Sequence, residues 1–199
     1  RAGLSWGTFA ARSAQLGETL QILHQAFSEE RIEFSGEHFA VSDLPIKPGP
    51  TQQPRPPIVV GGVGEKYTLP LVARYADVWN VPTYALGDIE AKLAALRAIC
   101  QDIGRDPDSI VLSVEAVMAL APDEAALPRV RELAEKRFGD PGFGLREAGL
   151  IGTASAVVNR LGELMELGFG QLVLFTHDRC SEQTLELLSA EVIPQLPRV

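Results

Sequence analysis

A unit made of an apolar strand followed by a helix occurs four times over residues 57–199, and this repetition limits the folds that the chain can adopt. The predicted strands are residues 57–61, 76–81, 110–120 and 170–176. Strands that alternate with helices form parallel sheets, because each parallel pair needs a long crossover and buries both of its faces. The sequence therefore predicts an α/β fold, either a doubly wound sheet or a (β/α) barrel.

The residues before the first unit favour the barrel. Residues 1–30 carry apolar positions at spacings of four, three and four, which predict one face of a helix. Residues 31–56 contain two short alternating segments and then five prolines, with a sixth at position 57, which predict a small hairpin and an extended lead-in. A complete (β/α)8 barrel takes about 250 residues and eight strands. We therefore expect a single domain over residues 1–199 that forms the C-terminal half of a (β/α)8 TIM barrel.

The first residue is Arg1, and no methionine precedes Met118. We therefore expect the chain to be the C-terminal part of a longer protein. Four further strand–helix units encoded upstream would complete the barrel.

Composition favours a protein that acts on small molecules. The net charge is −8, from 18 Lys and Arg against 26 Asp and Glu, which disfavours a nucleic-acid surface. No apolar run is long enough for a membrane helix, and residues 1–3 do not resemble the start of a signal peptide, so we expect a cytoplasmic protein. Cys100 and Cys180 lack the spacing of a metal site, and no metal is predicted. Cys100 falls on an apolar helix face and is expected in the core.

A glycine-rich turn follows the first predicted strand. Gly61, Gly62, Val63 and Gly64 lead from this strand into a helix predicted over residues 65–75. Glycines allow the backbone to approach a ligand, and amides at a helix N-terminus attract phosphate. The spacing matches neither G-x-G-x-x-G nor a P-loop, so the residues alone leave two alternatives: a phosphate site or a tight turn.

Asn80 is a polar residue on an otherwise apolar strand face. The two-residue period places it opposite Trp79, at the end of the second strand. At the C-terminal end of a barrel strand it would point into the ligand-binding mouth. The alternative is that Asn80 caps the loop at Pro82.

Other polar residues allow both functional and structural interpretations. His177, Asp178 and Arg179 follow the fourth strand and could act in acid–base chemistry, or Asp178 could start the turn toward the last helix. Glu115, within an apolar strand, is expected in a barrel-interior salt bridge rather than as a catalytic base. Thr153 is expected to cap a helix N-terminus.

The order and spacing of several segments resemble the luciferase-like monooxygenase family. The resemblance covers essentially the whole chain, and the linked run from residue 55 to residue 80 is its most specific part. The segments that carry it are residues 16–23, 34–39, 54–64, 71–80 and 168–174.

This resemblance implies a (β/α)8 barrel that binds FMN or coenzyme F420 at its C-terminal mouth and transfers hydride or activates oxygen. It places Gly61, Gly62, Val63 and Gly64 beside the cofactor phosphate after the fifth barrel strand, with Asn80 near the same group. Most residues that face the cofactor ring lie on the early strands in this family. Catalytic residues are therefore expected in the absent N-terminal half, and FMN and F420 are not distinguished.

Two other functions remain as alternatives. A non-catalytic half-barrel would use its open strand edges to pair with a second copy or with another chain. We accordingly expect either a homodimer or the missing N-terminal half as partner. A phosphosugar isomerase or aldolase on the same barrel would need a strand-end lysine or glutamate, which the first, second and fourth strands lack.

Overall fold

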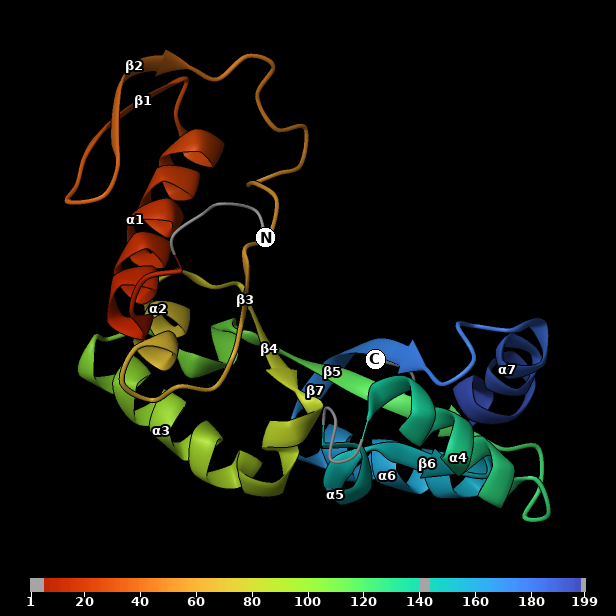
Figure 1. Ribbon diagram of the computed structural model, residues 1–199. Coiled ribbons are helices and arrows are strands. Elements are labelled where there is room, and N and C mark those ends of the chain that lie inside the picture. The colour runs from red at the N-terminus through yellow and green to blue at the C-terminus, as the bar shows by residue number, and fades with distance from the viewer. Residues whose placement is uncertain (1–5, 140–143, 198–199) are drawn as a thin grey trace.

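The computed structural model describes residues 6–139 and 144–197 (Figure 1). A helical arm and a hairpin come first, and a parallel sheet with its helices follows. In chain order the elements are α1 (Phe9–Ser28), β1 (Arg31–Ser35), β2 (Ala40–Pro45), β3 (Val59–Gly61), α2 (Thr68–Tyr75), β4 (Val78–Pro82), α3 (Ile89–Asp102), β5 (Val111–Leu120), α4 (Leu127–Phe138), α5 (Leu145–Ala148), β6 (Leu150–Gly152), α6 (Ala154–Glu166), β7 (Phe169–Thr176) and α7 (Glu182–Leu187).

The four predicted strands form one parallel sheet. They correspond to β3, β4, β5 and β7, which are hydrogen-bonded neighbours in chain order. Among the described strands, β3 and β7 have no partner on their outer edges, so the sheet stays open. The chain thus has the α/β fold of a partial barrel, and the predicted fold class is confirmed.

Strand β6 was not predicted. Its three residues pair in parallel with Met118, Ala119 and Leu120 at the end of β5. A segment this short shows no hydrophobic period, and it lies between a glycine-rich loop and a helix, where the sequence favours irregular structure. Part of that loop, with Pro141 and Gly142, lies outside the described residues.

The two faces of the sheet differ in their cover. Trp79 and Val114 point to a face where α2, α3 and α6 pack, and their side chains are fully buried in the main core. On the opposite face Val59 is 56% exposed and Phe175 is 42% exposed. Large apolar side chains on a sheet face normally pack against another layer, so this face is the inner wall of the incomplete barrel.

One part of the inner face is also covered by helices. Val117 and Ala119 form a second core cluster with residues of α4 and α5. The apolar alternation of β5 continues beyond its pairing with β4, which ends at Glu115. These last apolar side chains therefore need cover of their own, and α4 and α5 provide it.

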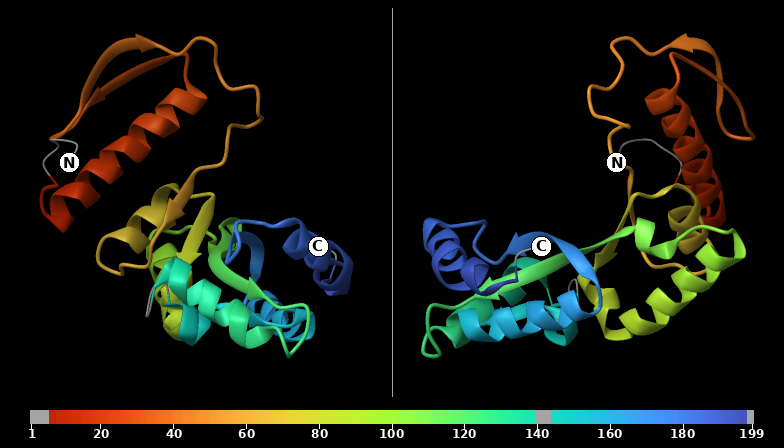
Figure 2. Two further views of the ribbon diagram at one scale, coloured as in Figure 1. Left: turned by 45° about the vertical axis from the view of Figure 1, so that its right-hand side comes forward. Right: turned by 180° about the vertical axis from the view of Figure 1, so that it is seen from behind.

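Helix α1 and the β1–β2 hairpin form an arm that stands away from the sheet (Figures 1 and 2). The Glu18 carboxylate on α1 accepts hydrogen bonds from the backbone amides of Glu37, His38 and Phe39 in the hairpin. A Cβ atom at Gly36 would collide with this carboxylate, so a larger residue there would displace the Glu18 side chain. The carboxylate therefore fixes the hairpin to the helix.

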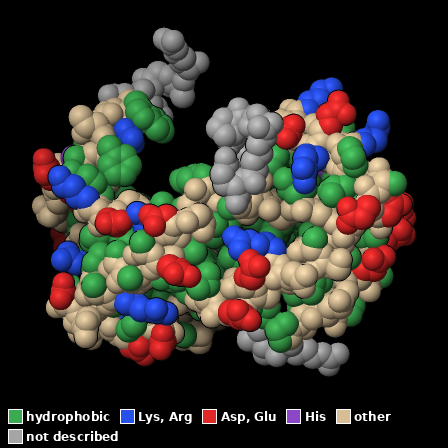
Figure 3. Space-filling model, turned by 90° about the horizontal axis from the view of Figure 1, so that it is seen from below, with side chains coloured by type: hydrophobic (Ala, Val, Ile, Leu, Met, Phe, Trp, Pro, Cys, Tyr) green, Lys and Arg blue, Asp and Glu red, His purple; other side chains and the backbone are tan. Residues whose placement is uncertain are grey.

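The surface carries charges of both signs. On the face drawn in Figure 3, Lys and Arg side chains alternate with Asp and Glu and form no continuous basic area. Of the described helices, none combines the length and hydropathy needed to cross a membrane.

Candidate functional site

The turn after β3 is built around Gly62. Its φ is +108°, a conformation that side-chain-bearing residues rarely adopt. Its amide donates to the carbonyl of Asn80 at 3.1 Å, and its own carbonyl accepts from the indole Nε1 of Trp79 at 2.7 Å. A Cβ atom at this position would lie 3.3 Å from the Thr68 side chain. The turn is therefore fixed to two consecutive residues of β4.

The turn leaves backbone amides available to a ligand. Helix α2 begins at Thr68, three residues later than predicted, and the Gly64 carbonyl accepts from the Thr68 amide at 2.8 Å. The amides of Val63, Gly64 and Glu65 donate to no residue within the described ranges. The first turn of α2 contains no acidic residue and no side-chain cap. Unpaired amides before a helix favour an anion.

Asn80 lies beside this turn. It pairs in register with Gly61 on one side and with Ser113 on the other. Its Oδ1 accepts a hydrogen bond from the Ser113 hydroxyl at 3.0 Å, so it does not cap the loop at Pro82. The Nδ2 group has no partner in the described part of the chain and can donate to a ligand. The structure thus brings Gly61 to Gly64 and Asn80 together at the carboxyl ends of two adjacent strands.

Glu65 follows the turn directly, and its negative charge opposes anion binding there. Its Oε1 lies 2.6 Å from Nζ of Lys92 on α3. Lys92 also lies 3.5 Å from Oδ2 of Asp88. The hydrogen bond that Lys92 donates to Glu65 raises the pKa of Lys92, which keeps the lysine charged. The carboxylate is therefore directed toward α3.

The residues after β7 form a structural turn. Burial raises the pKa of Asp178, but hydrogen bonds from Ser181 and Thr184 outweigh it and lower this pKa to about 2. The Thr184 hydroxyl donates to Asp178 Oδ2 at 2.6 Å, at the first turn of α7. Burial lowers the pKa of His177, whose Nδ1 is 3.9 Å from Asp178 Oδ1. Of the two interpretations, the structure supports the turn, and Arg179 adopts the positive φ of +62° that this turn needs.

Two other expectations are corrected. Glu115 forms no ion pair with any described residue, so the barrel-interior salt bridge is not observed. Its side chain lies half-buried on the incompletely covered inner face. Thr153 occupies the N-cap of α6, but its hydroxyl lies 3.3 Å from the hydroxyl of Ser155 and bonds no helix amide.

Cys100 is fully buried, as expected.

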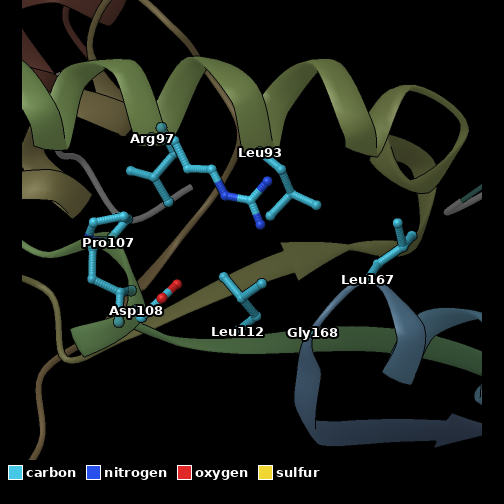
Figure 4. A pocket seen from close by; sticks show the side chains of 9 residues that line it. Leu93, Arg97, Pro107, Asp108, Leu112, Leu167 and Gly168 are labelled. Atoms are coloured by element: carbon cyan, nitrogen blue, oxygen red, sulfur yellow. The ribbon is translucent and has the colours of Figure 1, made fainter.

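A pocket at the other end of the sheet is separate from the turn (Figure 4). Leucines from α3 and β5 and the residue before β7 line a cavity of about 150 Å³, and the Arg97 side chain extends over it. Leu112 near the start of β5 and Gly168 just before β7 place it at the amino-terminal end of the strands. Ligands of parallel α/β sheets bind at the carboxyl end, so this pocket is not the cofactor site.

Two contacts of the site were missed by the sequence. The indole of Trp79 supports the turn through the Gly62 carbonyl, and Lys92 binds Glu65 across 27 positions of sequence. No local motif signals the second contact. The Trp79 contact could be predicted in part, because a buried tryptophan on the helix-covered face needs a hydrogen-bond acceptor.

Comparison with known proteins identifies the family. The sequence profile described as luciferase-like monooxygenase matches residues 1–139. The chain belongs to the luciferase-like monooxygenase family. The resemblance carried by the glycine turn and by the run that ends at Asn80 is confirmed.

Among similar members is the F420-dependent hydroxymycolic acid dehydrogenase of Mycobacterium tuberculosis, 31% identical over 122 residues, which are 61% of this chain and 33% of that protein. The F420-dependent glucose-6-phosphate dehydrogenase of Microbacterium testaceum is 26% identical over 98% of this chain and 64% of its own length. This chain thus spans less than two thirds of these two relatives.

Several solved structures share the fold of this chain. An F420-dependent secondary alcohol dehydrogenase in complex with an F420–acetone adduct superimposes with a TM-score of 0.81 and 15% identity, over 99% of this chain and 66% of that one. The EDTA monooxygenase of Chelativorans sp. BNC1 gives a TM-score of 0.71 and 17% identity, over 96% of this chain and 61% of that one. The open sheet therefore corresponds to part of a larger enzyme fold.

Proposed function

We propose that this chain supplies the phosphate-binding side of a flavin or deazaflavin site in a luciferase-like oxidoreductase. The observation that carries the proposal is the Gly62 turn, whose positive φ leaves the amides of Val63 and Gly64 unpaired before α2. Asn80 adds an amide group at the same edge of the sheet. A small phosphorylated cofactor fits such a set of neutral donors.

Coenzyme F420 and FMN are the two candidate cofactors. Both carry a phosphate on the side chain of a flat tricyclic ring. Relatives named as F420-dependent favour the deazaflavin, and the monooxygenase of the same fold keeps FMN as the alternative. When bound, the ring supplies the hydride or oxygen chemistry. The residues of this chain bind and orient its phosphate, and the substrate would be a small organic molecule.

Gly62→Val is the variant that tests the proposal. Its branched side chain would strain the positive φ and press on Thr68, which disturbs the amides of Val63 and Gly64. FMN and F420 titrations followed by their own fluorescence should show affinity reduced about tenfold or more. Riboflavin, which has the ring but no phosphate, should bind the variant and the wild type equally.

Gly170→Val is the matched control. No atom lies within 4 Å of a Cβ built at Gly170, which sits in β7, where valine is favourable. Its affinity for FMN should equal that of the wild type. If Gly62→Val binds FMN within about twofold of the wild type, roughly 0.4 kcal/mol, the turn is not the phosphate site.

A further inference from the structure

We infer that Lys92 is a positioning residue that keeps the glycine turn open to phosphate by holding the Glu65 carboxylate on α3. This inference rests on the proposed phosphate site at Gly61 to Gly64. It adds a residue that lies outside the turn and would not touch the ligand. Its role would be to remove a competing anion that the chain itself carries.

The geometry of the pair shows which partner is fixed. The Lys92 side chain is 20% exposed, whereas that of Glu65 is 57% exposed. Lys92 is held by Asp88 on its own side, one helical turn earlier, at 3.5 Å. Glu65 belongs to the irregular stretch between Gly64 and α2, outside any regular element. We infer from this that the packed lysine sets the position of the more exposed carboxylate.

The position of Glu65 matters because of the amides beside it. The amides of Val63, Gly64 and Glu65 itself have no partner among the described residues. A carboxylate binds such donors for the same reason that a phosphate does. Without Lys92, the Glu65 carboxylate can turn back to these amides or repel an incoming phosphate. Either event lowers affinity for an anion and leaves the fold unchanged.

Stability gives no comparable reason for the pair. An ion pair with an exposed partner such as Glu65 contributes little to folding, because water screens it and ordering two long side chains costs entropy. If Lys92 had a purely structural role, its loss would lower the free energy of unfolding slightly and would leave the turn amides unchanged. The effect of Lys92 should be found in the turn amides and in phosphate affinity.

The first experiment observes the turn without any ligand. Amide ¹H–¹⁵N spectra are compared for the wild type, Lys92→Met and the double variant Lys92→Met with Glu65→Gln. We expect the Val63 and Gly64 signals to move in Lys92→Met and to return toward wild-type positions in the double variant. Unchanged signals in Lys92→Met would overturn the inference, whether or not the protein binds phosphate.

The second experiment measures affinity with inorganic phosphate and with FMN. Lys92→Met should weaken both about three- to tenfold, and the double variant should recover to within about twofold of the wild type. Arg97→Met is the control, because it removes the same charge from α3 at a residue that forms no ion pair with any described residue.

The outcomes separate the two proposals. If Gly62→Val weakens FMN binding but Lys92→Met does not, the phosphate site stands and the role of Lys92 is wrong. If the double variant remains as weak as Lys92→Met, Lys92 acts through its own charge and the inference is also wrong. If neither single variant changes FMN affinity while the amide signals still respond, the proposed phosphate site is wrong. Lys92 then positions Glu65 without any effect on phosphate binding.

Discussion

Arg55 and Asp77 form a bidentate ion pair that joins the proline-rich segment to the start of β4. Arg55 Nη1 lies 2.6 Å from Asp77 Oδ2, and Nη2 lies 2.9 Å from Oδ1. The same carboxylate accepts the amide of Ile58 at 2.6 Å, immediately before β3. One aspartate thus aligns the edge strand that carries the glycine turn with the strand that carries Asn80.

Removing this pair should lower stability in a pH-dependent way. Burial raises the pKa of Asp77, but hydrogen bonds from Arg55 and Ile58 outweigh it and hold the pKa below its ordinary value. A lowered aspartate pKa stabilises the fold above the unfolded value, about pH 4, and this stabilisation is lost as pH falls through the folded value. Arg55→Met should cost about 1–2 kcal/mol at pH 7 and less below pH 4, as measured by urea unfolding.

The control for Arg55 is Arg31→Met. Arg31 pairs with Asp43 on the hairpin, where both side chains are exposed. This variant should unfold within about 0.5 kcal/mol of the wild type at both pH values. Equal losses in the two variants would mean that the Arg55–Asp77 pair has no special role.

Arg105 should stabilise the C-terminal end of α2. Its guanidinium donates to the carbonyl oxygens of Ala73 at 3.0 Å and Ala76 at 2.7 Å. A cation that binds the last carbonyls of a helix compensates both their missing hydrogen bonds and the helix dipole. Arg105→Met should cost about 1–2 kcal/mol in urea unfolding, and Arg105→Lys should lose less. A loss below 0.3 kcal/mol in Arg105→Met would contradict this assignment.

The hairpin should detach from α1 when Glu18 is neutralised. Desolvation raises the pKa of Glu18, but hydrogen bonds from Phe39, His38 and Glu37 outweigh it and lower this pKa. The contact is therefore present at neutral pH and is lost as pH falls through the lowered pKa. Glu18→Ala should speed hydrogen exchange of the three hairpin amides at pH 7.

Gly36→Ala should act on the same contact from the other side, because its Cβ would collide with the Glu18 carboxylate. Glu33→Ala is a control on the neighbouring strand β1. Glu33 accepts the amide of Asp43 and should protect only that position. Protection of Glu37, His38 and Phe39 that survives in Glu18→Ala would refute the carboxylate's role.

The open face should make the isolated chain associate. Val173 and Phe175 on β7 are exposed beside a strand edge that no described strand covers. Sedimentation at micromolar concentration should show dimers or larger species. Phe175→Lys should shift the distribution toward monomer, whereas Leu185→Lys, a similarly exposed site on α7, should not. A stable wild-type monomer with a cooperative melt would exclude association through this face.

The order of the parallel strands could be predicted because each strand is a run of apolar residues long enough to be recognised in the sequence. The second strand was expected at residues 76–81 and runs from Val78 to Pro82. Residues 65–67 were assigned to a helix because nothing in their types forbids it. The bonds from Thr68 and Leu69 to the Gly64 carbonyl, which form only in the folded chain, set the true start.

The site was predicted less evenly than the fold. Gly62 and Asn80 could be selected because glycine and asparagine are unusual at the end of apolar strands. Their role came from family resemblance and remains a prediction for this chain. Glu115 has no salt-bridge partner among the described residues, and one was expected because a rule for buried carboxylates was applied to a face that this chain leaves partly open. Sequence periodicity cannot show which face lacks its second layer.

The bond between Trp79 and the Gly62 carbonyl gives the protein an internal optical reporter. The sequence holds only two tryptophans, and the other, Trp6, is largely exposed. In a Trp6→Phe background, all tryptophan emission would originate from the indole that touches the turn. A change in that emission on adding phosphate would then follow the turn in real time, without any attached dye and without a turnover assay.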